Sequence, residues 1–88
     1  MKVSINKYGE VLIFRPAGKD AFFMTKSYIF DSLKKDDSID LDCSKVKVLT
    51  PSWADEFISG IKNSYKNTIN YLNTQNESVE ASLKVILE

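Results

Sequence analysis

The chain has 88 residues, a length that allows one small domain with a modest core. Its twelve basic and twelve acidic residues cancel, and a chain of zero net charge lacks the long-range field that attracts nucleic acid or an anionic membrane. The shares of hydrophobic residues (43%) and charged residues (27%) are typical of a folded protein, not a disordered one. We therefore predict a single domain over residues 1–88 that binds neither nucleic acid nor membrane.

The residue types that are missing restrict the chemistry further. The chain has no histidine, which removes the commonest metal ligand and the usual general base near neutral pH. Cys43 is the only cysteine, so one chain can form neither a disulfide nor a thiolate zinc site. Glycine-rich nucleotide-binding motifs are absent as well. The sequence therefore predicts a protein that is not an enzyme and that uses no metal or cofactor.

Targeting features point to one compartment. The N-terminal segment Met1–Lys7 lacks the apolar core of a signal peptide. No apolar run approaches the ~20 residues that a membrane span needs. A lone cysteine fits a reducing environment. Together these features predict a cytoplasmic protein.

Two short strands are expected at the start of the chain. Val3 and Ile5 alternate with polar neighbours, and residues 11–14 form an apolar run. Gly9 lies between them, where a turn needs a residue that adopts positive φ readily. This spacing predicts an antiparallel hairpin, which Pro16 and Gly18 end.

A helix is predicted from Lys19 or Asp20 to about Lys35. The aspartate near its start and the lysines at its end suit the helix dipole. Its apolar face is formed by Phe22, Phe23, Ile29, Phe30 and Leu33. If Phe23 or Phe30 lies outside the core, that side chain marks an interface.

A strand with one apolar face is expected at residues 39–43, where apolar residues alternate with aspartates. Residues 44–49 continue as a loop or a short extended segment. The acidic side chains of this region lack the spacing of a calcium loop, so we interpret them as a solvated face; they are Asp36, Asp37, Asp40 and Asp42. Because Asp42 ends the strand, we expect it near the start of the next helix.

The next helix is the clearest element. Apolar residues recur at helical spacing from Trp53 to Tyr65, and polar residues occupy the other side. A strand at 68–73 and a final helix at 77–87 follow. The order is strand, strand, helix, strand, helix, strand, helix. This order predicts an α/β fold with a mixed, mostly parallel sheet of about four strands covered by helices.

The start of this clearest helix carries the most informative motif, Thr50-Pro51-Ser52-Trp53-Ala54-Asp55-Glu56. Proline suits a first helical turn because its φ is preset and its missing N–H is not needed there. Either Thr50 or Ser52 can cap the helix, and Ser52 with Asp55 three residues later matches a capping box. A hydroxyl at a helix start can also carry a phosphate. The local sequence leaves capping and modification open.

The segment from Leu41 to Phe57 resembles the prokaryotic STAS-like domain family of unknown function. Members of that family run from an aspartate-bearing strand, here with Asp42, through a short loop into a Thr-Pro-Ser-aromatic-Ala-Asp-Glu helix start. The close match covers about a fifth of the chain, and the order of elements extends it over the whole length. The resemblance implies the STAS fold, in which helices pack on a β-sheet.

STAS domains include the bacterial anti-sigma factor antagonists, in which a partner kinase phosphorylates a serine at the start of the second helix. That kinase is also the anti-sigma factor, and phosphorylation ends the partnership. The resemblance places Ser52 at this serine and implies an ATP-binding partner of the histidine-kinase type. The neighbouring residues differ from those of the antagonists: Thr50 replaces an aspartate, Pro51 a small hydroxyl residue, and Trp53 a glycine.

We therefore predict a regulatory protein-interaction module with Ser52 as its phosphorylation or contact site. The residues predicted to bind the partner are Thr50, Pro51, Ser52, Trp53, Asp55 and Glu56. One alternative is a small hydrolase or transferase that uses Ser52 as nucleophile beside Asp42 or Asp55, although carboxylates alone rarely activate a serine. Another is an unregulated structural subunit that forms a homodimer, which zero net charge favours.

Overall fold

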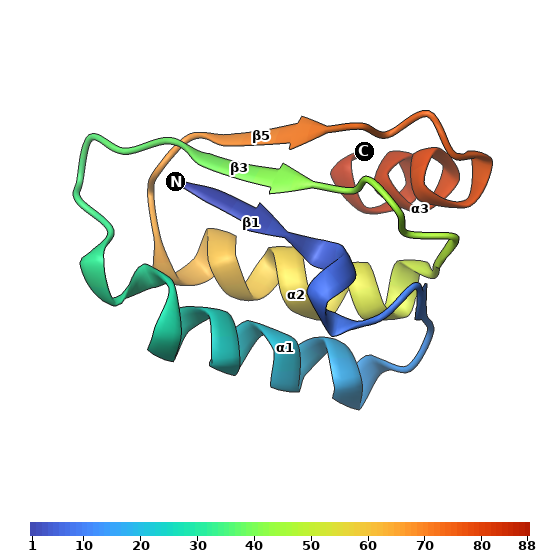
Figure 1. The fold of residues 1–88 in the computed structure, drawn as a ribbon, viewed down its shortest axis with the longest axis horizontal. Helices are drawn as coiled ribbons and strands as arrows, with labels where there is room; N and C mark the ends of the chain where they lie inside the picture. Colours follow the sequence, from blue (N-terminus) through green and yellow to red (C-terminus); the bar gives the residue numbers. More distant parts are fainter.

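The computed structural model describes residues 1–88 and contains two sets of parallel strands and three α-helices (Figure 1). A three-stranded sheet has the order β1-β3-β5, formed by Lys2–Ser4, Ile39–Asp42 and Ile69–Leu72. A separate two-stranded ladder pairs β2 (Val11–Leu12) with β4 (Val48–Leu49). The predicted α/β class and the predicted order of elements are confirmed, and β4 is the short extended segment between the third strand and the second helix.

The first two strands do not form the predicted antiparallel hairpin. β1 pairs in parallel with β3, and β2 pairs in parallel with β4. Between them, Ile5–Tyr8 forms a 3-10 turn that buries Ile5. Gly9 follows with φ 130°, the positive value that its position predicted. The 3-10 turn carries the chain out of the sheet, so strands that are close in sequence join different ladders.

The first helix, α1, spans Arg15–Tyr28, so it begins and ends earlier than predicted. Pro16 lies in its first turn, where its missing N–H is not needed. Gly18 is buried against the second helix, and a Cβ at this position would lie 2.5 Å from the backbone oxygen of Trp53. Only glycine permits this approach. Pro16 and Gly18 therefore belong to the helix and do not end a strand, and a 3-10 turn, Phe30–Ser32, follows the helix.

The other two helices, α2 (Pro51–Ser64) and α3 (Glu77–Leu87), lie where the sequence predicts them. α1 and α2 lie side by side beneath one face of the three-stranded sheet, and α3 packs against α2 and β4 (Figure 1). Asn76 caps α3 because its side chain accepts hydrogen bonds from the backbone N–H groups of Ser78 and Val79. α1 and α2 both begin at the end of the sheet toward which the strands run, so two helix starts and α3 meet there.

The core lies between the sheet and these two long helices. Its most deeply buried large side chains are Val3, Ile5, Ile39, Leu41, Trp53, Phe57, Ile61 and Val79. The sequence left open whether Phe23 or Phe30 lies outside the core. Phe30, in the 3-10 turn after α1, is buried, and Phe23, in α1, is 49% exposed. The outer face of the sheet carries Asp40 and Asn70, which share a hydrogen bond of 2.8 Å, and also Leu72, which is 37% exposed. None of the helices combines the length and the apolar character that crossing a bilayer requires.

Candidate functional site

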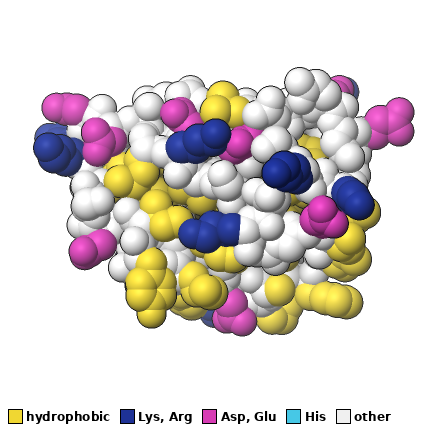
Figure 2. All heavy atoms as spheres, viewed as in Figure 1, with side chains coloured by type: hydrophobic (Ala, Val, Ile, Leu, Met, Phe, Trp, Pro, Cys, Tyr) yellow, Lys and Arg dark blue, Asp and Glu magenta, His cyan; other side chains and the backbone are white.

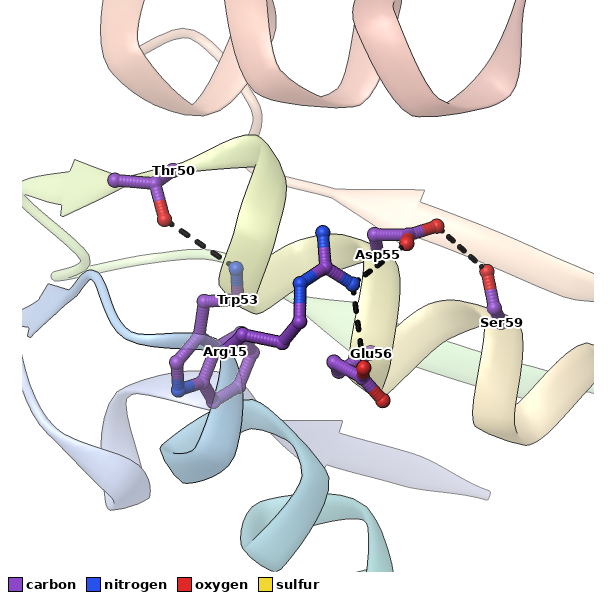
Figure 3. A network of polar contacts seen from close by, with 6 residues as sticks. All are labelled: Arg15, Thr50, Trp53, Asp55, Glu56 and Ser59. Atoms are coloured by element: carbon purple, nitrogen blue, oxygen red, sulfur yellow. Dashed lines mark hydrogen bonds and ion pairs between the residues drawn. The ribbon is translucent and has the colours of Figure 1, made fainter.

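The start of α2 is organised by Thr50 (Figure 3). Its Oγ1 accepts a hydrogen bond of 3.3 Å from the backbone N–H of Trp53, which makes Thr50 the N-cap. The same hydroxyl donates to the backbone oxygen of Ile13 at 2.6 Å and ties the start of α2 to the segment before α1. The interpretation of Ser52 and Asp55 as a capping box is therefore wrong, because Thr50 provides the cap and the Asp55 carboxylate is bound elsewhere.

Ser52 lies at the surface with a free hydroxyl. Its side chain is half-buried, and none of the hydrogen bonds at the start of α2 uses its Oγ. It borders a shallow hollow of about 390 Å³ that three elements form together. The residues around this hollow are Arg15 from α1, Pro51, Ser52 and Asp55 from α2, and Val85, Ile86 and Glu88 at the end of α3. Because Thr50 caps the helix, Ser52 is left without a structural hydrogen bond.

Arg15 joins the first turn of α1 to the second turn of α2 (Figure 3). Its Nη1 donates to Oδ2 of Asp55 at 2.9 Å and to Oε1 of Glu56 at 3.2 Å. Asp55 also accepts a hydrogen bond of 2.9 Å from the hydroxyl of Ser59. The hydrogen bond from Arg15, and then that from Ser59, lowers the pKa of Asp55. A single guanidinium therefore bridges two carboxylates of α2.

The six residues predicted to bind a partner do not all reach the surface. Five of them are exposed or half-buried: Thr50, Pro51, Ser52, Asp55 and Glu56. Trp53 is the exception, because only 2% of it is exposed. Its ring stacks on that of Phe57, with 5.0 Å between centroids, one helical turn further along the buried face of α2. Trp53 is a core residue, so its place among the predicted contact residues is corrected.

A comparison with known families adds to this geometry. A family model described as a STAS-like domain of unknown function (DUF4325) matches residues 26–79, which is more than half of the chain. The chain belongs to this family. No curated protein and no solved structure matches it significantly. The resemblance of the STAS-like segment Leu41–Phe57 is thus confirmed at the level of the family.

The hollow at Ser52 is built partly outside the segment that defines the STAS-like family. Ser52 and Asp55 lie within the matched residues 26–79, whereas Arg15 and the end of α3, with Val85, lie beyond its two ends. The family segment therefore supplies the serine and its helix. The flanking parts of this STAS-like domain supply the cation and the apolar wall.

Sequence reasoning missed Arg15 and the end of α3 as neighbours of Ser52. Arg15 carries a signal that was available, since it is the only arginine among the twelve basic residues. Arginine is the side chain best suited to bridging carboxylates and to binding phosphate. No local pattern indicates Val85 and Ile86, because their position depends on how α3 folds back onto α2 and β4.

Asp42 ends β3 with hydrogen bonds of its own. Its Oδ1 accepts from the side chain of Asn73 at 2.7 Å and from the backbone N–H of Ser44 at 3.0 Å. Lys2 adds an ion pair of 3.3 Å. These contacts, with that of Asn73 the strongest, lower the pKa of Asp42 to about 2. The carboxylate fixes the loop after β3, and it makes no hydrogen bond to Ser52 of the kind that a general base makes to its nucleophile.

The other reactive side chains of this region are separate from one another. Cys43 is buried, and burial, followed by the charge of Asp42, raises the pKa of its thiol to about 11, so the thiol stays protonated at neutral pH. The carboxylate of Asp37 binds the backbone N–H of Lys34. No group of three or more carboxylate or thiol side chains lies close enough together to share a metal ion.

Proposed function

We propose that this STAS-like domain is a non-enzymatic regulatory module that binds a protein partner around the start of α2, with Ser52 as its contact and phosphorylation site. The observation that carries this proposal is the free hydroxyl of Ser52 at the edge of the hollow. A serine that only caps a helix uses its oxygen at the helix end, and here Thr50 does so instead. The hydroxyl of Ser52 is thus available to another molecule.

The surroundings of Ser52 support a protein as that molecule. Pro51 and Val85 line the hollow, Pro51 as an exposed residue and Val85 as one that is 63% exposed, and Phe14, the residue before Arg15, is 71% exposed. Charged groups, Arg15 and Asp55, lie beside these apolar side chains. Exposed apolar side chains beside charged groups are typical of a surface that binds another protein.

The partner we propose is an ATP-binding protein of the histidine-kinase type, in line with the resemblance to the anti-sigma factor antagonists. In the phosphorylation step, the γ-phosphoryl group of ATP moves to Oγ of Ser52. The bond between Oγ and phosphorus forms, the bond to ADP breaks, and a base of the kinase takes the hydroxyl proton. The new charge of about −2 adds negative charge to a contact surface that contains apolar side chains and carboxylates, and so weakens the complex.

A pull-down from the cells that produce the protein tests this proposal, with the parent compared to Ser52→Ala and Ser52→Asp. We expect Ser52→Ala to keep the partner and Ser52→Asp to recover at least about tenfold less of it, because a charge enters the contact surface. Ser64→Ala and Ser64→Asp, at the exposed far end of the same helix, are the matched controls. The same partners in the same amounts for all five proteins would exclude the switch at Ser52.

The non-enzymatic part of the proposal has a test of its own. The hydrogen bonds of Asp55 go to Arg15 and Ser59, so this carboxylate is not positioned to activate the Ser52 hydroxyl. We therefore expect a serine-directed phosphonate to leave Ser52 unlabelled in the folded protein. Labelling at Ser52 that disappears on unfolding would favour the serine-dependent hydrolase instead.

A structural homodimer is the second candidate, and the outer side of α1 favours it. Phe23, Met24 and Tyr28 are 49%, 51% and 82% exposed on this helix. Figure 2 shows hydrophobic side chains gathered along the lower edge of the molecule, where α1 runs. Light scattering over a range of concentrations decides: a doubled molar mass that Tyr28→Ser returns to that of one chain supports the dimer. One chain at every concentration excludes it.

A further inference from the structure

We infer that Arg15 is the residue that binds a phosphate on Ser52, and that it leaves Asp55 and Glu56 to do so. The inference rests on the proposed phosphorylation of Ser52 and names the residue that responds to it. Arg15 and Ser52 border the same hollow, and Arg15 is the only cation there. A phosphate of charge about −2 on Ser52 has no other positive side chain at the hollow with which to pair.

The main chain at Arg15 is held close to the start of α2 by two contacts. Gly18, one turn after Arg15, lies against the backbone oxygen of Trp53. On the other side of Arg15, the backbone oxygen of Ile13 accepts the hydrogen bond from Thr50. These contacts fix the first turn of α1 beside the first turn of α2. The arginine is therefore in place before any phosphate arrives.

The guanidinium itself is free to turn. The Arg15 side chain is 49% exposed, and both of its ion pairs use a single nitrogen, Nη1. An arginine has five N–H donors, so most of those of Arg15 are unused. The remaining donors allow it to contact a stronger acceptor first and then to release the two carboxylates, without a change in the backbone.

A phosphate on Ser52 competes with the two carboxylates for this arginine. Exposed ion pairs such as that of Arg15 with Asp55 contribute little to stability because water screens them. A phosphate offers a higher charge and paired oxygens that match the planar guanidinium. The exchange therefore favours the phosphate, and Asp55 keeps its hydrogen bond to Ser59 while Glu56 loses its partner.

The exchange has a consequence on a second surface. Asp55 and Glu56 also line a groove of about 340 Å³ between α1 and α2, beside Lys19 and Phe23. When Arg15 turns to the phosphate, both carboxylates of this groove lose their ion pair. The charge state of Ser52 thus changes the electrostatics of a groove that Ser52 itself does not line.

The test uses the full chain with phosphoserine placed at position 52 during translation, so no kinase is needed. Phosphorus NMR gives the pH midpoint at which the phosphate loses its second proton. We expect this midpoint to lie roughly half a pH unit lower in the parent than in Arg15→Gln, because the guanidinium favours the dianion. Lys19→Gln, which removes a cation one turn further along the same helix, is the control and leaves the midpoint unchanged.

A second readout follows Arg15 directly. Its side-chain N–H signals and the amide signals of Asp55 and Glu56 are expected to shift when Ser52 carries the phosphate. Arg15→Lys, which keeps the charge but loses the planar donors, is expected to give an intermediate phosphate midpoint.

Three outcomes overturn the inference. The first is the same pH midpoint of the phosphate in the parent and in Arg15→Gln, and the second is a set of Arg15 side-chain N–H signals that do not shift on phosphorylation. The third is a phosphoprotein that fails to fold because its phosphate is not neutralised. Failure of the proposed function is a different result. If Ser52→Asp leaves the recovered partners unchanged, the switch is excluded, while the phosphate midpoint measured on phosphoserine 52 still decides the role of Arg15.

Discussion

The two helix starts that meet at the hollow follow similar strands but are held in different ways. Each follows a two-residue strand whose second residue is buried, and each has a proline in its first turn. At α2 the cap residue, Thr50, accepts a hydrogen bond from the helix, whereas Phe14 at the same position of α1 makes no side-chain cap. The start of α2 is stabilised by its own residues, and the start of α1 depends on contacts with α2.

This difference explains why the sequence predicts the start of α2 correctly but not the start of α1. Thr50 and Pro51 form a local signal that any helix with those residues carries. Phe14 is not a capping residue, and Gly18 taken alone argues against a helix. What places α1 is the approach of Gly18 to the backbone of Trp53, a contact between positions far apart in the chain.

The largest expected effect comes from breaking the contact that places α1. In an ordinary helix, alanine is more stable than glycine by about 1 kcal/mol. In Gly18→Ala the new Cβ meets the backbone oxygen of Trp53 at 2.5 Å, so we expect the free energy of unfolding to fall by about 3 kcal/mol. Urea unfolding measures this, and Lys19→Ala at the exposed neighbouring position is the control. A more stable Gly18→Ala protein would mean that the helices do not pack this closely.

Protonation of Asp42 in acid is expected to lower the free energy of unfolding, because its carboxylate holds the loop that leads from β3 toward α2. The pKa of Asp42 is lowered to about 2 in the folded protein, so its stabilising contribution is complete above the pKa of the unfolded chain and is lost as the pH falls toward 2. We expect a loss of about 2 kcal/mol in the free energy of unfolding between roughly pH 5 and pH 2.

Urea unfolding at a series of pH values measures this contribution of Asp42. Asp42→Asn is expected to be less stable at pH 6 and to lack this part of the pH dependence. Asp20→Asn, at an exposed position of α1, is the matched control. If Asp42→Asn and the parent lose the same stability between pH 5 and pH 2, Asp42 is not the group responsible.

Removing the cap of α2 has the next expected effect in size. Thr50→Ala removes the acceptor for the N–H of Trp53 and the donor to Ile13, so we expect a loss of about 1.5 kcal/mol. Thr50→Ser keeps the hydroxyl and is expected to retain most of the stability. Thr68→Ala, an exposed threonine before β5, serves as control. Thermal unfolding in which Thr50→Ala matches the parent would show that the cap is dispensable.

The smallest expected effect comes from giving α1 a side-chain N-cap of the kind that Thr50 provides for α2. Phe14→Ser places a capping hydroxyl at the start of α1, and little packing is lost because Phe14 is 71% exposed. We expect a gain of about 0.5 kcal/mol in the free energy of unfolding over Phe14→Ala, which removes the same ring without adding a cap. Equal stabilities of the two variants would show that the start of α1 has no room for a side-chain cap.

Much of the fold follows from local patterns. α2 and α3 lie where their apolar periodicity predicts them, with the Thr-Pro motif also marking the start of α2. The alternation of Ile39, Leu41 and Cys43 correctly predicts which residues of β3 and of the position after it are buried. The hairpin prediction is wrong because spacing alone does not determine a partner strand. The 3-10 turn at Ile5–Tyr8 separates β1 from β2, and parallel pairing with β3 and β4 is a long-range choice.

The candidate site shows the same division. The sequence singles out Thr50, Ser52 and Asp55 because they stand together in one motif at a helix start. The apolar spacing that begins at Trp53 also predicts a buried position for this side chain, which the structure has, so its inclusion among the contact residues followed the motif against the periodicity. The sequence does not show that Arg15 reaches Asp55 across 40 positions of the chain.

The sequence by itself determined the α/β class, the second and third helices and the motif: these, and the membership of the STAS-like segment, all rest on residues that are neighbours in the chain. Only the tertiary structure decided which strands pair, where α1 begins and which residues surround Ser52. The physical reason is that periodicity, caps and turns act over a few residues. The close approach of Gly18 to Trp53 and the bridge from Arg15 to Asp55 exist only once α1 and α2 have packed.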